Sequence, residues 1–462
     1  MSYPGRIWSD FWHSASGGVN VKEVEAEYWD PQIETMKRDE LERLQLKKLK
    51  WQVERVYKHS EFYRERFKKA GVKPGDIKSL DDVSKLPIVT KGELRQEQTS
   101  YPPFGRYAVA PTSDWKELHP STGTTGVPVN TLWTYRDTEI ITDHTARLIW
   151  GFGVRKEDVI QNGFSYGLWV AGIAVHYAAA KIGSFVIPIG ATSSERQIYY
   201  LQHAKSTVLF ATPSFGLYIA EKLKEKGVRP EDINLRIGSF GGEAGTENPA
   251  TRKRLEDGLG IDAYDFYGLA EIGPTFAAEC VEKAGLHFAE DHYLIEVLDP
   301  ETREPLSVGE KGVLVITHLS REGTPMIRYW TNDIVRLEDE KCGCGRTHIR
   351  AVGGILGRAD DMIVFKGENV YPSQIEEVIR SFPELGNEYK IVVTKSRDTG
   401  IVTNVEVLAE LAAEVKNVEE LKERVKRALR DSLLVRVEVE ILPPNSLERT
   451  EFKAKRVEFV ME

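Results

Sequence analysis

The sequence is poor in cysteine and lacks long apolar runs. Three cysteines in 462 residues are too few, and odd in number, to form a disulfide framework, which fits a reducing compartment. The longest apolar stretch, 168–189, is interrupted by Lys181 and Gly183, which favours buried elements over a membrane span. The chain begins with charged residues such as Arg6 and Asp10 and does not resemble a secretion signal. We therefore expect a cytoplasmic protein.

The chain also lacks an excess of positive charge. It has 62 Lys and Arg against 71 Asp and Glu, a net charge of −9, which argues against broad adhesion to nucleic acid or to an anionic membrane. The sequence contains no internal repeat and no low-complexity tract. Its length predicts two or three domains. We expect small-molecule partners; the sequence leaves the oligomeric state open, a homodimer included.

Short apolar runs alternate with helical patterns in the middle of the chain. The runs are 185–187, 208–210, 235–240 and 263–267. This alternation predicts an α/β fold with a parallel sheet. Earlier, an apolar stripe within 41–56 has helical spacing and predicts a long amphipathic helix.

The pattern changes in the 300s. Segments 313–317 and 334–337 predict a small antiparallel β-region, and Gly357 to Asp361 marks a boundary. About a hundred residues follow with strands and helices, enough for a compact α+β unit. We expect a large N-terminal domain over 1–357, with parallel or mixed sheets, helices and the β-region, and a small C-terminal domain over 358–462.

A loop rich in glycine and hydroxyl residues lies in the first third of the chain. It is not a Walker A loop, because the Gly-Lys-Ser/Thr ending is absent. Glycine permits close backbone approach, and hydroxyl and amide groups can donate to phosphate oxygens. The loop is therefore a candidate phosphate site, with a plain surface linker as the alternative. Its residues are Ser121, Thr122, Gly123, Thr124, Thr125 and Gly126.

All three cysteines fall within the predicted β-region or close to it. Cys280 is followed by His287, and Cys342 and Cys344 flank one glycine. Three sulfurs and an imidazole form a closed tetrahedral set, the usual arrangement of structural Zn²⁺. The alternative is that these cysteines are small apolar core residues. His292 and His348 are reserve ligands in this hypothesis.

Five segments together resemble the acyl-adenylate-forming enzyme superfamily in order and spacing. They are the glycine-rich loop, 266–271, 328–333, 357–361 and 449–456. Within the superfamily the sequence resembles phenylacetate-CoA ligases through further motifs at 28–31, 62–64, 86–87, 90–91 and 369–376. The resemblance covers nearly the whole chain after residue 27.

The resemblance implies an ATP-dependent acid:CoA ligase. Such an enzyme joins an aryl or arylacetic acid to AMP, releases pyrophosphate, and then transfers the acyl group to CoA. The implied cofactors are ATP, Mg²⁺ and CoA, and the C-terminal domain is expected to be mobile, rotating about a hinge near Asp360. Two alternatives stay open: a stand-alone adenylyltransferase that does not use CoA, and a nucleotide-binding sensor without turnover.

The resemblance also implies roles for individual residues. Lys453 is the catalytic lysine that bridges the acyl carboxylate and the α-phosphate, although Phe452 stands where the family usually has glycine. Glu271 follows a predicted strand and would hold Mg²⁺, which prefers oxygen ligands; the alternative is a solvated loop acid. Asp333 would bind the ribose hydroxyls. The remaining residues expected at the nucleotide or CoA are Gly242, Glu243, Tyr267, Gly268, Arg358 and Gly367.

An aromatic acid needs an apolar pocket. Tyr166, Leu168 and Trp169 lie in one turn, and Phe240 and Ile272 flank the nucleotide motifs. These side chains are candidates for enclosing a flat ring. Packing in the core is the alternative role for the same residues.

Overall fold

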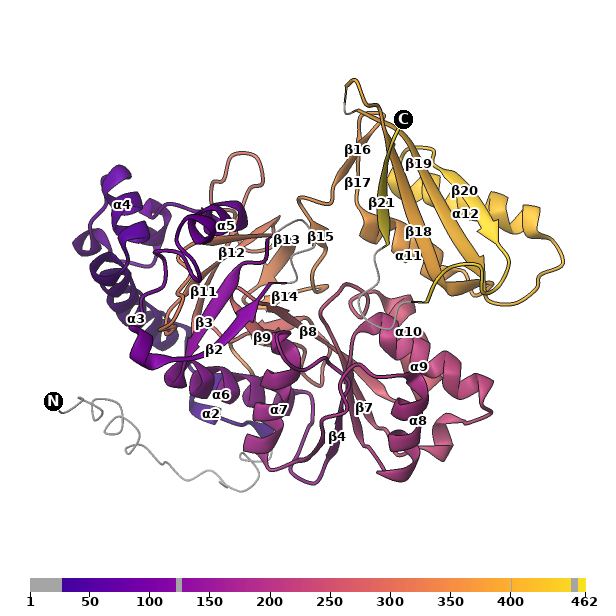
Figure 1. The fold of residues 1–462 in the computed structure, drawn as a ribbon, viewed down its shortest axis with the longest axis horizontal. Helices are drawn as coiled ribbons and strands as arrows, with labels where there is room; N and C mark the ends of the chain where they lie inside the picture. The colour runs from indigo at the N-terminus through magenta and orange to yellow at the C-terminus, as the bar shows by residue number, and fades with distance from the viewer. Residues whose placement is uncertain (1–26, 122–126, 400, 450–455) are drawn as a thin grey trace.

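The computed structural model describes residues 27–121, 127–399, 401–449 and 456–462. Thr122 to Gly126 and Lys453, expected at the phosphates, therefore lie outside the described residues. Figure 1 shows a large body of sheet and helices, with a smaller unit placed above one side of it. The confirmed fold class is α/β with a separate C-terminal α+β region.

One sheet runs through the large body, and within the described residues it contains thirteen strands. Five neighbouring strands pair in parallel. They are β5 (Phe185–Ile187), β4 (Val159–Asn162), β6 (Val208–Ala211), β7 (Ile237–Phe240) and β8 (Asp262–Leu269). The predicted runs correspond to four of these strands, which confirms the expected parallel sheet.

The sheet continues from β8 without a break into antiparallel strands. In spatial order they are β9 (Gly273–Ala278), β10 (Leu286–Phe288), β14 (Arg350–Ala351), β13 (Tyr329–Glu338), β12 (Lys311–His318) and β11 (Tyr293–Leu298). Two short strands, β1 (Val89–Thr90) and β15 (Gly357–Arg358), also pair with β13. The β-region predicted for the 300s is therefore an extension of the main sheet.

Helices cover both faces of the parallel strands. Along β6, Val208 and Phe210 pack in one cluster of buried side chains, while Leu209 and Ala211 pack in another. This alternation follows from the two-residue period of a strand, and both faces are apolar because helices cover both. The first face carries α6 (Tyr135–Gly151) and α7 (Val170–Ile182); the second carries α8 (Ser194–His203), α9 (Pro213–Glu225) and α10 (Pro249–Leu259).

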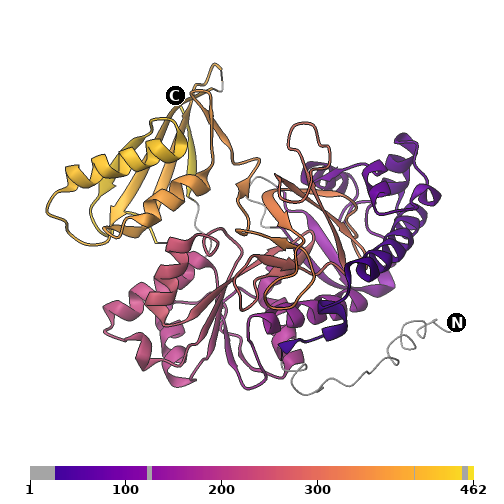
Figure 2. The ribbon, with the colours of Figure 1, turned by 180° about the vertical axis from the view of Figure 1, so that it is seen from behind.

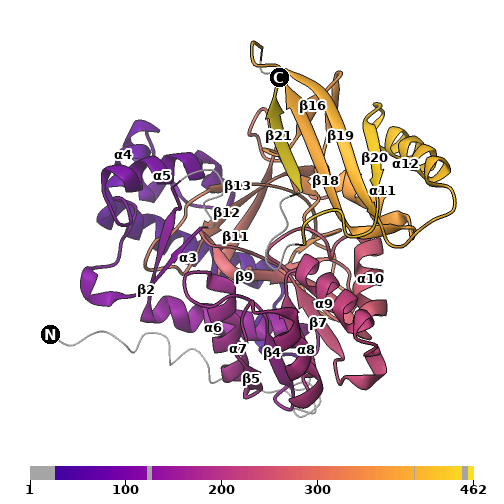
Figure 3. The same cartoon turned by 45° about the vertical axis from the view of Figure 1, so that its right-hand side comes forward.

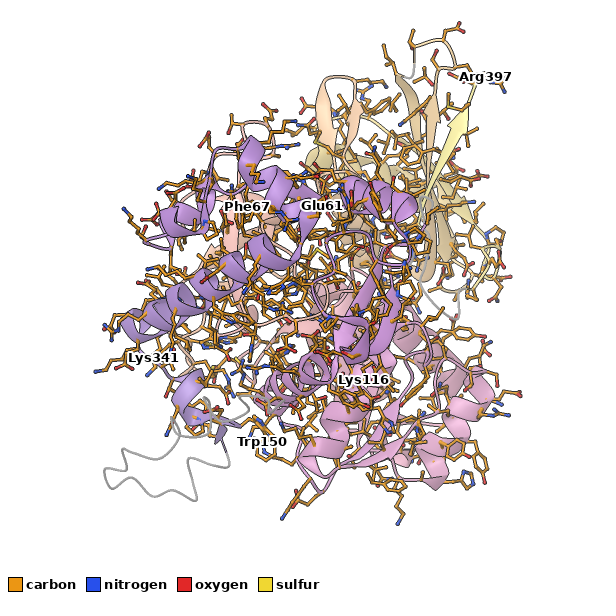
Figure 4. The ribbon with its side chains drawn as sticks, turned by 60° about the vertical axis from the view of Figure 1, so that its left-hand side comes forward. Glu61, Phe67, Lys116, Trp150, Lys341 and Arg397 are labelled. Atoms are coloured by element: carbon orange, nitrogen blue, oxygen red, sulfur yellow. The ribbon has the colours of Figure 1, made fainter. Side chains whose placement is uncertain are left out.

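The N-terminal helices pack beside the antiparallel part of the sheet (Figure 1). The stripe predicted within 41–56 lies on α3 (Arg38–His59), where Leu41, Leu49, Val53 and Val56 are fully buried. Phe67 of the next helix packs in the same core and is labelled in Figure 4. The other elements of this part are α2 (Pro31–Glu34), α4 (Glu61–Lys69), α5 (Lys91–Ser100), β2 (Trp115–Pro120) and β3 (Asn130–Thr134).

The C-terminal unit has its own four-stranded sheet in the order β20-β19-β18-β21. Its buried side chains form a cluster drawn from 363–439 alone. Viewed from behind in Figure 2, two helices cover one face of this sheet. Its elements are β16 (Ile363–Phe365), β17 (Glu368–Val370), α11 (Pro372–Ser381), β18 (Leu385–Lys395), β19 (Val402–Leu411), α12 (Val418–Leu433), β20 (Glu438–Leu442) and β21 (Val457–Met461).

Short single-turn segments complete the architecture. They are the 3-10 helices Pro74–Asp76, Asp81–Lys85, Thr112–Asp114 and Pro230–Asp232. Across the described residues, none of the helices combines the length and the apolar character needed to cross a membrane.

Candidate active site

Three residues from separate motifs meet where β8, β13 and β15 lie together. The Tyr267 hydroxyl donates to Asp333 Oδ2, and Arg358 Nη1 donates to Asp333 Oδ1 over 2.8 Å. Asp333 lies opposite Arg358 in the β13–β15 pair. Burial raises the pKa of Asp333, and Arg358 and Tyr267 partly oppose this rise. The site therefore contains a buried carboxylate whose two oxygens both face hydrogen-bond donors.

Arg358 links this carboxylate to the start of the C-terminal unit. Its Nε and Nη2 donate to the two carboxylate oxygens of Asp360 over 2.9 and 2.8 Å. Asn332 Nδ2 also donates to Asp360, over 3.1 Å. The expected hinge residue is thus tied to the strand that carries Asp333.

Glu271 lies in the turn between β8 and β9 and is only 3% exposed. The Lys91 ammonium is 2.9 Å from Glu271 Oε1. Burial and the adjacent Glu271 raise the pKa of Tyr329 well above its usual range, since the tyrosine hydroxyl donates to this carboxylate. Tyr329 and Asp333 point to the same face of β13, because they are separated by an even number of residues. The alternative that Glu271 is a solvated loop acid is therefore wrong.

The candidate phosphate loop connects the two strands of the β2–β3 hairpin. Ser121 at its start is buried, and its Oγ accepts from the Val129 amide over 3.0 Å. From α5, Gln98 Nε2 donates to Pro128 O over 2.8 Å and Gln98 Oε1 accepts from the Asn130 amide over 2.6 Å. The described base of the loop is thus fixed on both sides by hydrogen bonds.

The turn after β7 brings a nucleotide motif against an aromatic side chain. Gly242 has φ +87°, and a Cβ built there would lie 3.1 Å from the Trp169 indole. Both the backbone angle and the contact therefore favour glycine. Glu243 accepts from the Ser214 amide in the first turn of α9 over 2.8 Å. A carboxylate at that position suits the positive end of the helix.

The candidate acyl-pocket residues divide into two groups. Phe240 and Ile272 are completely buried, as expected of core residues. Leu168 is 64% exposed. Trp169 lies between Gly242 and Phe164, whose ring centroid is 5.1 Å away in an edge-on arrangement. Trp169 thus packs directly against Gly242 of the turn after β7.

Two further glycines of the predicted site have different surroundings. A Cβ at Gly268 would collide with the carbonyl oxygen of Pro274 on the neighbouring strand, so packing alone requires glycine there. Gly367 has φ +88° in the β16–β17 turn, and its missing Cβ would meet nothing within 4 Å. Lys366 also has positive φ, as two-residue hairpins of this kind require. Gly367 is therefore set by turn geometry.

The three cysteines and His287 converge on one point. Their ligand atoms all lie within 4.8 Å of one another, and all four residues are buried. Cys280 Sγ is 3.8 Å from Cys342 Sγ, and Cys344 Sγ is 3.6 Å from His287 Nε2. Tetrahedral zinc bond lengths give about 3.8 Å between two sulfurs and about 3.6 Å between sulfur and nitrogen. These two distances agree with those expected between ligands of a tetrahedral metal site.

The reserve ligands lie elsewhere. His348 contacts the carbonyl oxygens of Phe288 and Ile33, and His292 pairs with Asp291. Both histidines have a lowered pKa, chiefly because they are buried. Neither belongs to the cluster.

The cysteine cluster also anchors the N-terminal segment. The Tyr28 hydroxyl donates to Cys344 O over 2.9 Å, and a Cβ at Gly345 would collide with that hydroxyl. Arg346 Nη2 lies 2.6 Å from Glu34 Oε2 of α2. The cluster thus lies where β9, β10 and the turn before β14 meet the first described residues.

Comparison with known proteins decides the family. The AMP-binding enzyme family matches residues 121–320, and the AMP-binding enzyme C-terminal domain matches 367–458. A phenylacetate-coenzyme A ligase of Thermus thermophilus is 38% identical over 442 residues, covering 92% of this chain and 97% of the relative. The chain belongs to the phenylacetate-coenzyme A ligase family of AMP-binding enzymes. The Escherichia coli member is 35% identical and covers 93% of this chain and 96% of its own.

Solved structures of 2-hydroxyisobutyryl-CoA ligase resemble this family member to different degrees. The postadenylation state with 2-HIB-AMP has a TM-score of 0.89 at 31% identity, covering 94% of this chain and 92% of the other. The thioesterification state with 2-HIB-AMP and CoA has a TM-score of 0.72 at the same identity, covering 95% and 93%. An open conformation also scores 0.72. Since the identity is equal, the arrangement of the parts accounts for the difference.

Sequence reasoning missed Lys91 as a site residue of this ligase-family chain. The pair 90–91 entered only as a likeness to the family. Its contact with Glu271 depends on β1 pairing with β13, between Val89 and Tyr329. A two-residue strand has no periodicity. The available signal was the position of Lys91 as the first residue of α5, directly after the N-cap residue Thr90.

Proposed function

We propose that this protein is an ATP-dependent acid:CoA ligase that activates an aryl or arylacetic acid as acyl-AMP and passes the acyl group to CoA. The main support is the meeting of Tyr267, Asp333 and Arg358 beside Glu271, in a chain matched over nearly its full length by phenylacetate-coenzyme A ligases. The small-molecule partners are the acid, ATP and CoA.

In the first step, a carboxylate oxygen of the acid attacks the α-phosphorus of ATP. A bond forms between this oxygen and the α-phosphorus. The bond from the α-phosphorus to the oxygen that bridges it to the β-phosphate breaks, and pyrophosphate leaves. Asp333 would accept from the ribose hydroxyls, because its carboxylate is held in place by Tyr267 and Arg358. Lys453 would stabilise the negative charge shared by the carboxylate and the phosphate in the transition state.

Glu271 has the properties expected of a Mg²⁺ ligand. Its carboxylate is buried, and the Lys91 ammonium pairs with Oε1 over 2.9 Å. A buried carboxylate oxygen with spare acceptor capacity suits a hard cation. Mg²⁺ bound there would neutralise phosphate charge on ATP. Lys91 would then be available to a phosphate or to the acid.

In the second step, the CoA thiol attacks the acyl carbon, the bond to the AMP oxygen breaks, and the thiol proton passes to solvent. We place the domain division at 357/358 and the hinge at Asp360. This division falls within β15 (Gly357–Arg358), the last strand of the main sheet, and the support is that β16 begins the second unit a few residues later. Gly367 would line the path of the pantetheine arm, since the turn around it leaves open space at its Cα.

The assay follows pyrophosphate, AMP and thioester over a panel of aryl and arylacetic acids, with and without CoA. A ligase yields thioester and AMP only when CoA is present. Pyrophosphate release that is indifferent to CoA, with no thioester by mass spectrometry, would instead indicate a stand-alone adenylyltransferase. Absence of turnover with every acid would favour a nucleotide sensor.

We also propose that Cys280, His287, Cys342 and Cys344 hold a structural Zn²⁺. The support is the agreement of their spacing with tetrahedral zinc geometry, together with complete burial. A cytoplasmic, reducing location would keep these thiols available to the metal.

Elemental analysis of protein purified without a histidine tag tests this site. We expect about one equivalent of zinc per chain, and a chelator should lower the melting temperature. Less than about half an equivalent, with no effect of the chelator, would contradict the proposal.

A further inference from the structure

Arg254 reaches from the large body into the C-terminal unit. Its Nη2 donates to the backbone oxygens of Arg380 and Phe382 over 3.1 and 2.9 Å. Its Nη1 donates to Gly386 O over 3.1 Å and to Asn387 Oδ1 over 3.3 Å. Arg254 lies on α10, whereas all four acceptors lie at or after the end of α11. Figure 3 shows these two helices next to each other at the junction of the two units.

The chemistry of this contact is unusual for a partly buried guanidinium. All four described acceptors are uncharged. Burial, together with the neighbouring Arg380, lowers the pKa of Arg254 to about 10. A buried charge is costly unless hydrogen bonds compensate it. The carbonyls at the C-terminal end of α11 suit this role, since they lack partners within the helix and carry the negative end of its dipole.

The four acceptors can receive hydrogen bonds from Arg254 in only one placement of the C-terminal unit. They sit on a unit that has its own core, so they move with it as a group. A second contact between the two units is an ion pair: Arg449 Nη2 lies 3.3 Å from Glu221 of α9 and 2.6 Å from Glu410. If the unit rotated, Arg449 would keep Glu410, which belongs to its own unit. Arg254 would lose all four partners.

The placement seen here matches one state of a related ligase. The TM-score is 0.89 against the postadenylation state and 0.72 against both the thioesterification state and the open conformation of the same protein. The Arg254 contacts therefore belong to a placement like that of the postadenylation state.

We propose that Arg254 is a positioning residue that stabilises the adenylation placement of the C-terminal unit and so sets the balance between the two half-reactions. This inference rests on the proposed ligase function for its kinetic consequence. Its structural consequence, the placement of the unit, does not depend on activity. Arg254 contacts no substrate in this role; it acts through α11.

The kinetic test separates the two half-reactions. Arg254→Ala should slow pyrophosphate release by about tenfold or more, because charged hydrogen bonds are lost. Thioester formation from synthetic phenylacetyl-AMP and CoA should stay at the wild-type rate or rise. Arg254→Lys keeps the charge without the two-pronged geometry and should fall between Ala and wild type. Lys253→Ala on the same helix, where the lysine pairs with Asp257, is the matched control.

The placement test measures the distance between the two units directly. Spin labels at Glu231→Cys and Glu423→Cys use side chains that are 72% and 62% exposed, whereas the native thiols are buried. Pulsed EPR should give one narrow distance population in the parent and in Lys253→Ala. Arg254→Ala should broaden it or add a second population.

Each result has a defined meaning. Equal slowing of both half-reactions, or an unchanged distance distribution in Arg254→Ala, would overturn the role of Arg254. A parent protein without ligase activity would refute the proposed function, while the distance measurement would still test the placement. If Arg254→Ala does not fold, the same measurements on Arg254→Lys decide the case.

Discussion

The large body and the C-terminal unit hold their chemistry in different ways. Tyr267 and Asp333 lie on strands of one continuous sheet and are joined by a hydrogen bond. The C-terminal unit, which follows Asp360, has a separate sheet and core. Its junction with α10 is made by polar contacts such as those of Arg254. The side of the candidate site that carries Asp333 is thus held by buried strands, whereas the C-terminal unit is held against α10 by polar contacts.

The largest expected effect concerns the C-terminal part of the chain, which contains Lys453. Lys453→Ala should lower the rate of acyl-AMP formation by about a hundred- to a thousandfold, because it removes a positive charge from the transition state. Thioester formation from supplied acyl-adenylate should persist. Single-turnover pyrophosphate release and thioester assays measure the two steps. Lys455→Ala is the matched control. Equal loss of both steps in Lys453→Ala would contradict a role for Lys453 in acyl-AMP formation alone.

The next effect tests the fixed side. Asp333→Asn should raise the KM for ATP by about ten- to a hundredfold, because a charged hydrogen-bond acceptor for the ribose is lost. Initial rates at varied ATP concentration measure it. Asp360→Asn is the control, since Asp360 also pairs with Arg358 but lies outside the buried carboxylate position. A KM for ATP that changes in Asp360→Asn but not in Asp333→Asn would contradict the proposal that Asp333 binds the ribose.

A third prediction concerns the stability of the large body. Cys344→Ser and His287→Gln should each lose zinc and lower the melting temperature by about 5–10 °C, because a metal ligand is removed. Elemental analysis and calorimetry provide the readouts. The exposed His59→Gln should retain both metal and melting temperature. Wild-type protein that is purified without zinc, or variants that keep the wild-type melting temperature, would argue that the four residues are ordinary core.

The smallest effect lies at the junction. Burial raises the pKa of Glu247 to about 7, with Glu376 of α11 adding to the rise. Because the folded state then holds the proton more tightly than the unfolded state, the stability contribution is full below about pH 4.5 and is lost as the pH rises through about 7.

Glu247→Gln removes this titration. Between pH 5 and pH 8 the unfolding free energy of the wild type should therefore fall by about 2 kcal/mol more than that of the variant. Denaturant titrations at several pH values measure the difference. The exposed Glu231→Gln should follow the wild type, and parallel curves for Glu247→Gln and wild type would exclude the effect.

Much of the fold was predictable because local patterns determine it. The apolar stripe predicted within 41–56 lies on α3, and its buried residues repeat at helical spacing. The strands at 208–211 and 262–269 follow from apolar runs that are buried on both faces. The merging of the β-region with the parallel sheet was not predictable, because strand pairing between distant segments leaves no local trace.

The candidate site was likewise predictable only in part from the sequence. Asp333, Arg358 and Glu271 were identified through motifs, whereas the hydrogen bond between Arg358 and Asp333 and the ion pair between Lys91 and Glu271 emerged only in three dimensions. The cysteine cluster followed from composition and ligand chemistry. Lys91 entered only through the resemblance at 90–91, and Arg254 lies in none of the motifs; each gains its partners from a segment more than a hundred residues away.

The most direct test of the central claim follows the oxygen atoms of the acid. Phenylacetate labelled with ¹⁸O in both carboxylate positions is converted with ATP and CoA, and the products are analysed by mass spectrometry. Attack of the carboxylate on the α-phosphorus predicts one ¹⁸O in each AMP released, with pyrophosphate unlabelled. AMP without label, or label in orthophosphate formed together with ADP, would contradict an acyl-adenylate route.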